Sequence, residues 1–204
     1  MDRLPPFDEL KGLREELDGV FAGGQDERKR KKPYIIDEIL DLLIMDYIFG
    51  NESGNEMLYG PTETEDGEVK RTVQIDIDDM NKAVFRVIAG KNWEQRISEY
   101  LDDENGTVDE IIRVVDTDMT RIYNDAILDV GERSEGNIIK TWETVLDDRV
   151  RDTHMELQSV SVPINGRFHS FDGDSAKYPG DFTDPQNNIN CRCRIVLSYG
   201  DGEL

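Results

Sequence analysis

The stretch DTDMTRIYNDAILDVGERSEGNIIKTWETVL, residues 116–146, changes its hydrophobic period part of the way along. Its first part repeats apolar residues every three or four positions, at Met119, Ile122, Tyr123, Ala126, Ile127 and Val130. This period predicts an amphipathic helix. After Gly136 the side chains alternate instead, with Ile138, Lys140 and Trp142 on one side and Ile139, Thr141 and Glu143 on the other. Alternation is typical of a β-strand, so the stretch predicts a helix that leads into a sheet.

Towards the amino terminus the sequence predicts further helices. Residues 7–21 carry one apolar stripe that stops at Gly23 and Gly24. Residues 33–49 begin with Pro33, a residue favoured at the first helical position, and are apolar around much of the helix circumference. We therefore expect this second helix to be buried by neighbours or by another protein. Between the two helices we expect a basic linker, and after them a long exposed loop over residues 50–73.

A second helical block is predicted before the stretch quoted above. It comprises residues 78–90, residues 92–103 and residues 107–115. Thr107 and Glu110 have the spacing of a capping box, which marks a helix start.

The carboxy-terminal part has strand-like texture. Residues 160–171 hold two short alternations around Asn165-Gly166, a pair that favours a tight hairpin, and residues 191–199 form a last β-branched run. The predicted fold class is α+β: a helical amino-terminal part, reaching to about residue 135, and a small module with a short antiparallel sheet. We place the domains at 1–90, which includes the basic linker and an acidic loop, and at 91–204.

Composition restricts the classes of function. The formal net charge of −21 disfavours general binding of duplex nucleic acid, because phosphate backbones repel such a chain. No run of 18 apolar residues is present, so we expect no membrane span. Two cysteines in 204 residues favour a reducing compartment, with the cytoplasm as the default. One local exception to the acidity is a run of five basic residues, which can contact nucleic acid or an acidic partner or form a solvated linker: Arg28, Lys29, Arg30, Lys31 and Lys32.

The two cysteines, Cys191 and Cys193, are one residue apart. On a strand such residues point the same way at about 6.6 Å, which makes a disulfide between them improbable. They can supply half of a zinc site, completed by His154 and by His169 or a carboxylate, or they can be small buried side chains. A nucleophilic cysteine is disfavoured, because alternation places Arg192 and Arg194 on the opposite face.

Two further groups of residues are candidates for chemistry. In DDRVRDTH, residues 147–154, a short helix would bring Asp147, Arg151 and His154 onto one face. Such a face can bind phosphate or transfer protons, or it can simply orient a turn and cap a helix. In residues 172–188 four aspartates have a loose calcium-like spacing without the register of a calcium loop, so we predict a turn-rich loop over the sheet.

The order of these motifs resembles the phage Mu F-like minor head proteins, also called phage head morphogenesis proteins. The resemblance rests on TDMTRIYN (117–124), KTWETVLDDRVRDTH (140–154), VPING (162–166), YPGD (178–181) and NCRC (190–193), and it covers roughly residues 92–199. The motif residues are Trp142, Asp147, Arg149, Arg151, His154, Pro179, Gly180, Asn190, Cys191 and Cys193. Relatives commonly have Glu at the position of Asp118, and an L-D-G turn at Leu157-Gln158-Ser159, where loss of the glycine suggests a reshaped turn.

The resemblance implies a structural or assembly protein of a tailed-phage head, present in a few copies and not an enzyme. Its expected partners are the portal protein and other head proteins, with weak DNA contact through Arg28–Lys32. The expected location is the interior of the virion head, after assembly in the bacterial host cytoplasm. Some relatives carry fused toxin domains, and we expect none here because eleven residues follow Cys193. The alternative is an enzyme: a small nuclease or transferase toxin that uses Arg149, Arg151 and His154, or a zinc-dependent hydrolase.

Overall fold

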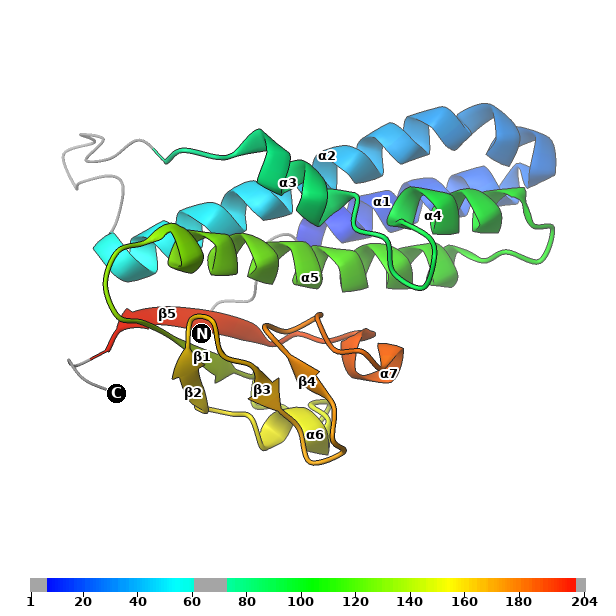
Figure 1. Ribbon diagram of the computed structural model, residues 1–204. Helices are drawn as coiled ribbons and strands as arrows, with labels where there is room; N and C mark the ends of the chain where they lie inside the picture. The colour runs from blue at the N-terminus through cyan, green and yellow to red at the C-terminus, as the bar shows by residue number, and fades with distance from the viewer. Residues whose placement is uncertain (1–6, 61–72, 201–204) are drawn as a thin grey trace.

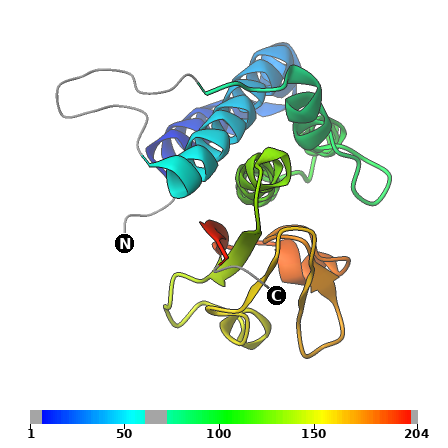
Figure 2. The ribbon, with the colours of Figure 1, turned by 60° about the vertical axis from the view of Figure 1, so that its left-hand side comes forward.

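A computed structural model describes residues 7–60 and 73–200 of the chain, and the side chains from Leu10 onward. Helix α5 (Val108–Arg133) lies between a layer of helices and a small sheet module, as Figures 1 and 2 show. The upper layer holds α1 (Phe7–Ala22), α2 (Gly24–Tyr59), α3 (Ile77–Val84) and α4 (Trp93–Asp102). Side chains of α5 belong to both hydrophobic cores, because Ile122 packs with the helices and Ile127 packs with the sheet module. This arrangement confirms the α+β class.

Three predictions about residues 24–59 are wrong, because these residues form one helix, α2. It runs without a break over 36 residues, so the basic run is helical and not a linker, and Pro33 lies inside the helix and not at its start. Residues 50–59 continue the helix where a loop was predicted, and residues 61–72 lie outside the described part of the chain. An interior proline loses one backbone hydrogen bond. The helix tolerates this because a fully buried stripe continues past it, at Ile35, Ile39, Leu43 and Tyr47.

Two glycines explain why residues 50–58 resemble a loop in the sequence. Gly50 and Gly54 are buried on the face of α2 that packs on α5. A Cβ atom on Gly50 would lie 2.3 Å from the carbonyl oxygen of Tyr123, and one on Gly54 would lie 3.1 Å from the Cβ atom of Val130. The glycines therefore allow the two helix backbones to approach closely, and they do not mark a turn.

We expect Gly50→Ala to destabilise the protein by about 2–4 kcal/mol, because the new methyl group collides with backbone that cannot move without separating the helices. The measurement is urea unfolding. Gly12→Ala is the matched control: it lies inside α1 and has nothing within 4 Å of the added Cβ. It should stabilise the protein by about 0.5–1 kcal/mol. Equal effects of the two substitutions would contradict the close contact.

The remaining helices start and stop largely as the sequence indicates. The capping box of α5 is confirmed, since the Thr107 side chain accepts from the backbone N–H of Glu110 and the Glu110 side chain accepts from that of Thr107. Helix α4 has a second capping box, formed by Asn92 and Gln95. Helix α3 ends at Val84, short of the predicted Gly90. Among the described helices, none combines the length and apolar character needed to cross a membrane.

The sheet module follows α5. Strand β1 (Ile138–Glu143) is the centre of a three-stranded antiparallel sheet, between β2 (Ser161–Pro163) and β5 (Arg194–Tyr199). Strands β3 (Phe168–His169) and β4 (Ser175–Ala176) form a separate pair, and the short helices are α6 (Asp152–Met155) and α7 (Pro185–Asn188). The first and last strands of the module therefore pair along six residues, Ile138–Glu143 with Arg194–Tyr199.

The predicted hairpin at Asn165-Gly166 is wrong. A turn does form there, because the N–H of Gly166 donates to the carbonyl of Pro163. The flanking strands nevertheless separate: β2 pairs with β1, and β3 pairs with β4. A tertiary contact accounts for this separation of β2 and β3. The fully buried ring of Phe168, on β3, packs edge-on against Trp142 with 5.2 Å between ring centroids.

Candidate functional site

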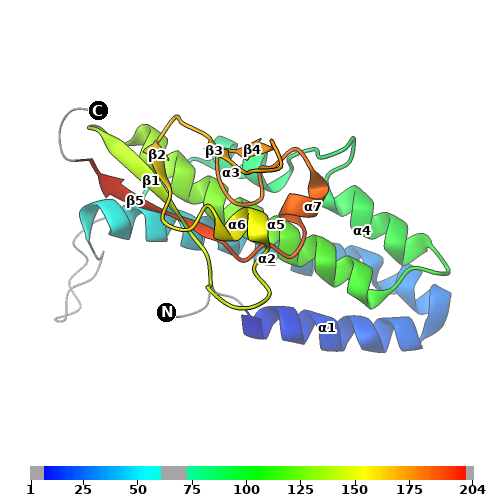
Figure 3. The ribbon, with the colours of Figure 1, turned by 90° about the horizontal axis from the view of Figure 1, so that it is seen from below.

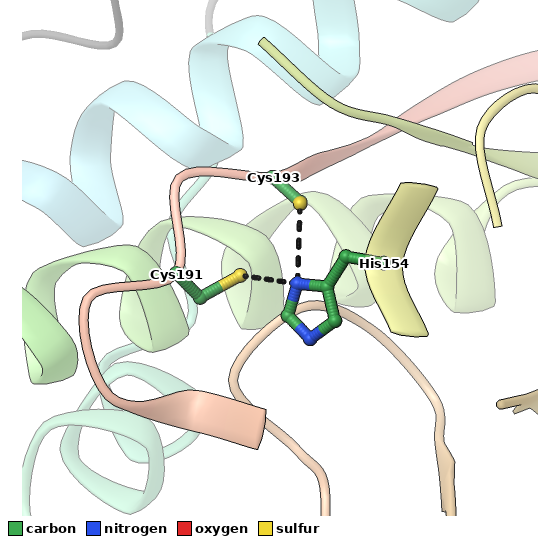
Figure 4. A group of neighbouring side chains, drawn as sticks. All are labelled: His154, Cys191 and Cys193. Carbon is green, nitrogen blue, oxygen red and sulfur yellow. Dashed lines mark hydrogen bonds between the residues drawn. The ribbon is translucent and has the colours of Figure 1, made fainter. Parts of the chain in front are cut away.

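A buried imidazole lies between two thiols. His154 is on α6, and Cys191 and Cys193 lie in the segment just ahead of β5, so the prediction that they belong to the strand is wrong. Both sulfurs nevertheless point to the same side, and each lies 3.5 Å from His154 Nδ1, as Figure 4 shows. The three side chains are 1–2% exposed, and their donor atoms all lie within 4.8 Å of one another. Both cysteines are free thiols.

Aromatic rings fix the imidazole. Phe182 stacks on His154 at 5.4 Å between ring centroids, and Trp142 meets its edge at 5.5 Å. Trp142 is fully buried at the centre of this group. The rings exclude water from one side of His154, and its second ring nitrogen, Nε2, has no hydrogen-bond partner among the described residues.

Helix α5 positions the cysteine segment through two polar side chains that the sequence reasoning missed. The Thr120 hydroxyl donates to the Cys191 carbonyl at 2.9 Å, and the Asn124 amide donates to the Cys193 carbonyl at 3.2 Å. Asn124 also accepts from the backbone N–H of Ile195 at 2.8 Å. Both residues lie in the motif TDMTRIYN (117–124), and the available signal was an asparagine among the apolar residues of a helix. Asn124 is fully buried, and a buried amide requires partners.

The arginines around the site make structural contacts. Arg192 binds Asp147 through two hydrogen bonds of 2.6 Å, and this ion pair holds the pKa of the Asp147 carboxyl well below its usual range. Arg151 donates to the carbonyl of Ile189. The predicted face of Asp147, Arg151 and His154 is therefore wrong, because α6 begins only at Asp152 and Asp147 pairs with a different arginine.

A hydrogen bond links the two buried thiols. The hydrogen bond from Cys193 lowers the pKa of the Cys191 thiol, with a further contribution from His154. The same contact, together with burial, raises the pKa of Cys193. Cys191 is thus the more acidic sulfur of the pair.

Other motif residues shape the loops around the site. Gly180 has φ of +99° and lies against Arg121, whose Cβ would be 2.8 Å from an added methyl carbon. Asn190 and Ser159 adopt positive φ values of 54° and 62°, so serine here takes the conformation that glycine favours. His169 lies on β3 and is not part of the three-donor group.

The aspartates of residues 172–188 form the predicted turn-rich loop. The Asp174 carboxylate accepts from the backbone N–H groups of Ser175, Thr183 and Asp184. Asp172 accepts from Ser170 and Asn187, and these hydrogen bonds lower the pKa of its carboxyl. The carboxylates of Asp172 and Asp174 therefore stabilise the loop through hydrogen bonds within it.

The basic run in α2 contacts the end of α4. Arg28 is 7% exposed and donates to the carbonyl of Asp103, and Lys32 pairs with the carboxylate of Asp102 at 2.7 Å. Cations at a helix carboxyl end satisfy free carbonyls and favour the helix dipole. Arg30 pairs with Glu27 on its own helix. Of the five basic residues, Lys29 and Lys31 are the two with neither an ion pair nor a hydrogen bond to a carbonyl in the described structure, and Lys31 lies over the ring of Tyr34.

A cleft of about 950 Å³ lies between α1, the first turns of α5 and the segment that carries the arginines. Two aspartates line this cleft, Asp109 and Asp116, and Asp109 pairs with Arg14 at 2.6 Å. Basic side chains outnumber them, namely Lys11, Arg14, Arg113, Arg149, Arg151 and Arg192. Arg113 and Arg149 are exposed. Figure 3 shows the molecule from below, with α6 and α7 in front of α5.

Comparison with known proteins gives one family and one distant relative. The chain matches the family described as Phage Mu protein F like protein over residues 78–196. It is also similar to the NAD(+)--arginine ADP-ribosyltransferase EFV of Enterococcus faecalis (strain ATCC 700802 / V583), with 26% identity over 120 residues. That match covers 57% of this chain and 24% of the transferase, so the chain spans about a quarter of the length of this relative. No solved structure matches the chain.

The family match extends from α3 to β5 and includes His154, Cys191 and Cys193. It covers more than half of the 204 residues. The protein therefore belongs to the Phage Mu protein F like family.

Proposed function

We propose that this protein is a minor structural component of a tailed-phage head, which associates with the portal and assists procapsid assembly, DNA packaging or ejection. The family match over residues 78–196 carries the proposal, since the family is associated with head morphogenesis. In this proposal the protein assembles in the bacterial host cytoplasm and is retained inside the virion head.

The geometry around His154 supports a non-catalytic role. A general acid or base must come within hydrogen-bond reach of its substrate. His154 is 1% exposed, its Nδ1 faces two sulfurs, and its ring is stacked on Phe182. Arg151 and Arg192 are bound to protein oxygens. These contacts suit residues that brace the module, and they leave the predicted toxin site without an accessible imidazole.

The arginine-lined cleft is the docking surface that we propose for a head partner. A chain with a net charge of −21 repels acidic partners at long range, so a local group of cations gives directional attraction. The exposed guanidinium groups of Arg113 and Arg149 suit a partner segment rich in carboxylates, which arginine binds through paired hydrogen bonds. Contact with DNA through Arg28–Lys32 stays a secondary proposal and would depend on Lys29 and Lys31.

Co-expression with the portal protein of the same phage tests the proposal. The full chain should co-purify with the portal assembly, and Arg113→Glu combined with Arg149→Glu should abolish this association. Lys29→Glu combined with Lys31→Glu is the matched control, because it reverses the same number of charges on α2. Loss of association in the control alone would contradict the cleft as the surface. Failure of the unaltered chain to associate with portal or procapsid would contradict the function.

The likeness to an arginine ADP-ribosyltransferase defines a second candidate. The full chain, incubated with labelled NAD⁺ and an arginine-rich acceptor, should transfer no label if the assembly proposal is right. A nuclease assay that compares the unaltered chain with His154→Ala addresses the other toxin class. Turnover that depends on His154, or label on arginine, would assign the protein to the enzymes.

A further inference from the structure

We propose that His154, Cys191 and Cys193 bind a zinc ion through Nδ1 and the two Sγ atoms. The distances fit the ion. With Zn–S bonds of about 2.3 Å and a Zn–N bond of about 2.0–2.1 Å at tetrahedral angles, a sulfur and a nitrogen ligand are separated by about 3.6 Å. Both sulfurs lie 3.5 Å from Nδ1. All three donor atoms lie within 4.8 Å of one another, so a single ion can bridge them.

Both sulfur contacts converge on one ring nitrogen. A ring nitrogen of neutral histidine either donates one hydrogen or accepts one through a single lone pair. Here two sulfurs converge on the same Nδ1 at the same distance, as the two dashed lines in Figure 4 show. That nitrogen bonds one sulfur at a time, and the other thiol bonds its neighbouring sulfur. A metal ion that shares the three donors satisfies all of them.

The donor set selects the metal class. Two thiolates and an imidazole are soft and intermediate donors that suit Zn²⁺, whereas Ca²⁺ and Mg²⁺ require oxygen ligands. Zinc also neutralises the negative charge of the two thiolates. Two buried thiolates without a counterion would be strongly destabilising, while a divalent ion neutralises both.

A small cavity provides the fourth coordination position. It has a volume of about 10 Å³ and is lined by all three donor residues, together with Asn190 and Arg192. This volume holds about one water molecule. We assign this position to a water molecule enclosed with the ion, because the three donor residues are only 1–2% exposed. Stacking on Phe182 and the edge contact with Trp142 orient the imidazole in place of a hydrogen bond to Nε2.

The ion would tie together parts of the module that have little regular structure. His154 belongs to the connection between β1 and β2, and the cysteines belong to the connection between α7 and β5. Thr120 and Asn124 already hold the cysteine carbonyls from α5. Binding of zinc then contributes directly to the free energy of folding, as in other structural zinc sites.

Metal analysis and cobalt substitution test the site on the full chain. Protein purified under reducing conditions with added zinc should contain one zinc ion per chain. Replacement by Co²⁺ should give a thiolate-to-cobalt charge-transfer band in the near ultraviolet and strong visible bands of tetrahedral cobalt. Cys193→Ser should weaken the charge-transfer band, and His154→Ala should shift the visible bands. His169→Asn, a change of the only other histidine, should alter neither.

Thiol labelling keeps the test independent of variant folding. In the unaltered chain, a chelator should release the zinc, lower the midpoint of thermal unfolding and make both thiols reactive towards a thiol reagent. Absence of zinc in the unaltered chain, together with no cobalt charge-transfer band, would overturn the proposal. This readout does not depend on portal binding, so the zinc site and the assembly role can fail separately.

Discussion

Asp118→Asn is expected to destabilise the protein by about 3–5 kcal/mol, because it leaves a buried arginine without its counterion. Asp118 and Arg121 are both 1% exposed, and the carboxylate accepts from Arg121 Nε at 3.0 Å and from Arg96 at 2.5 Å. Asparagine keeps the shape but removes the charge, and its NH₂ group must face one of the two guanidinium donors. The measurement is urea unfolding followed by the fluorescence of Trp93 and Trp142, which report on the two hydrophobic cores.

Two further variants test the physical cause. Asp109→Asn, on the same helix, breaks the ion pair with Arg14, but that carboxylate is 81% exposed. Its effect should be about 0–1 kcal/mol, as for other surface pairs. Asp118→Glu retains the charge and should recover much of the stability lost in Asp118→Asn. If Asn and Glu are equally destabilising at this position, geometry and not charge is responsible.

The parts of the fold that could be predicted are those in which local pattern and tertiary contact agree. The change of hydrophobic period after Gly136 predicted both the helix that is part of α5 and the strand β1. The burial of Ile138, Lys140 and Trp142 on one face of β1 follows the alternation in the sequence. Thr107 gave the start of α5 because a capping box is a local interaction that needs no partner from elsewhere.

The errors occur where a distant contact overrides local preference. Gly50 and Gly54 favour a loop in isolation, yet they are helical because α5 needs close approach at those positions. Asn165-Gly166 makes a turn, but its flanking strands pair elsewhere because Phe168 packs on Trp142. No pattern within either segment contains this information.

The candidate site was predictable only in its donor atoms. Two cysteines and a histidine are chemically conspicuous, so their types made a metal site one of two interpretations, beside small buried side chains, even without a standard spacing. The residues that position them were not conspicuous. Thr120 and Asn124 act through carbonyl groups of the cysteine segment, and Asp147 pairs with Arg192 across 45 residues of sequence. Such partners are set by the path of the chain in space.

Lys140→Met is expected to stabilise the protein by about 1–3 kcal/mol at neutral pH, because it removes a buried charge and preserves the volume of the side chain. Lys140 is fully buried on the inner face of β1, and its Nζ lies 5.8 Å from the ring centroid of Phe168. That nitrogen has no hydrogen-bond partner among the described residues. Lys29→Met, an exposed substitution on α2, is the control and should change the free energy of unfolding by about 0.5 kcal/mol or less.

The pH dependence separates loss of charge from improved packing. Burial, followed by repulsion from Lys177, lowers the pKa of Lys140 from 10.5 to about 8. Below pH 8 the lysine is protonated in both the folded and the unfolded chain, so the full destabilisation is present. Between pH 8 and 10.5 the folded chain releases its proton while the unfolded chain retains it, and stability therefore rises with pH. The advantage of the methionine variant should shrink over this range, as urea unfolding at several pH values would show. A constant advantage would mean that packing alone accounts for it, and no advantage at neutral pH would mean that the ammonium group is solvated.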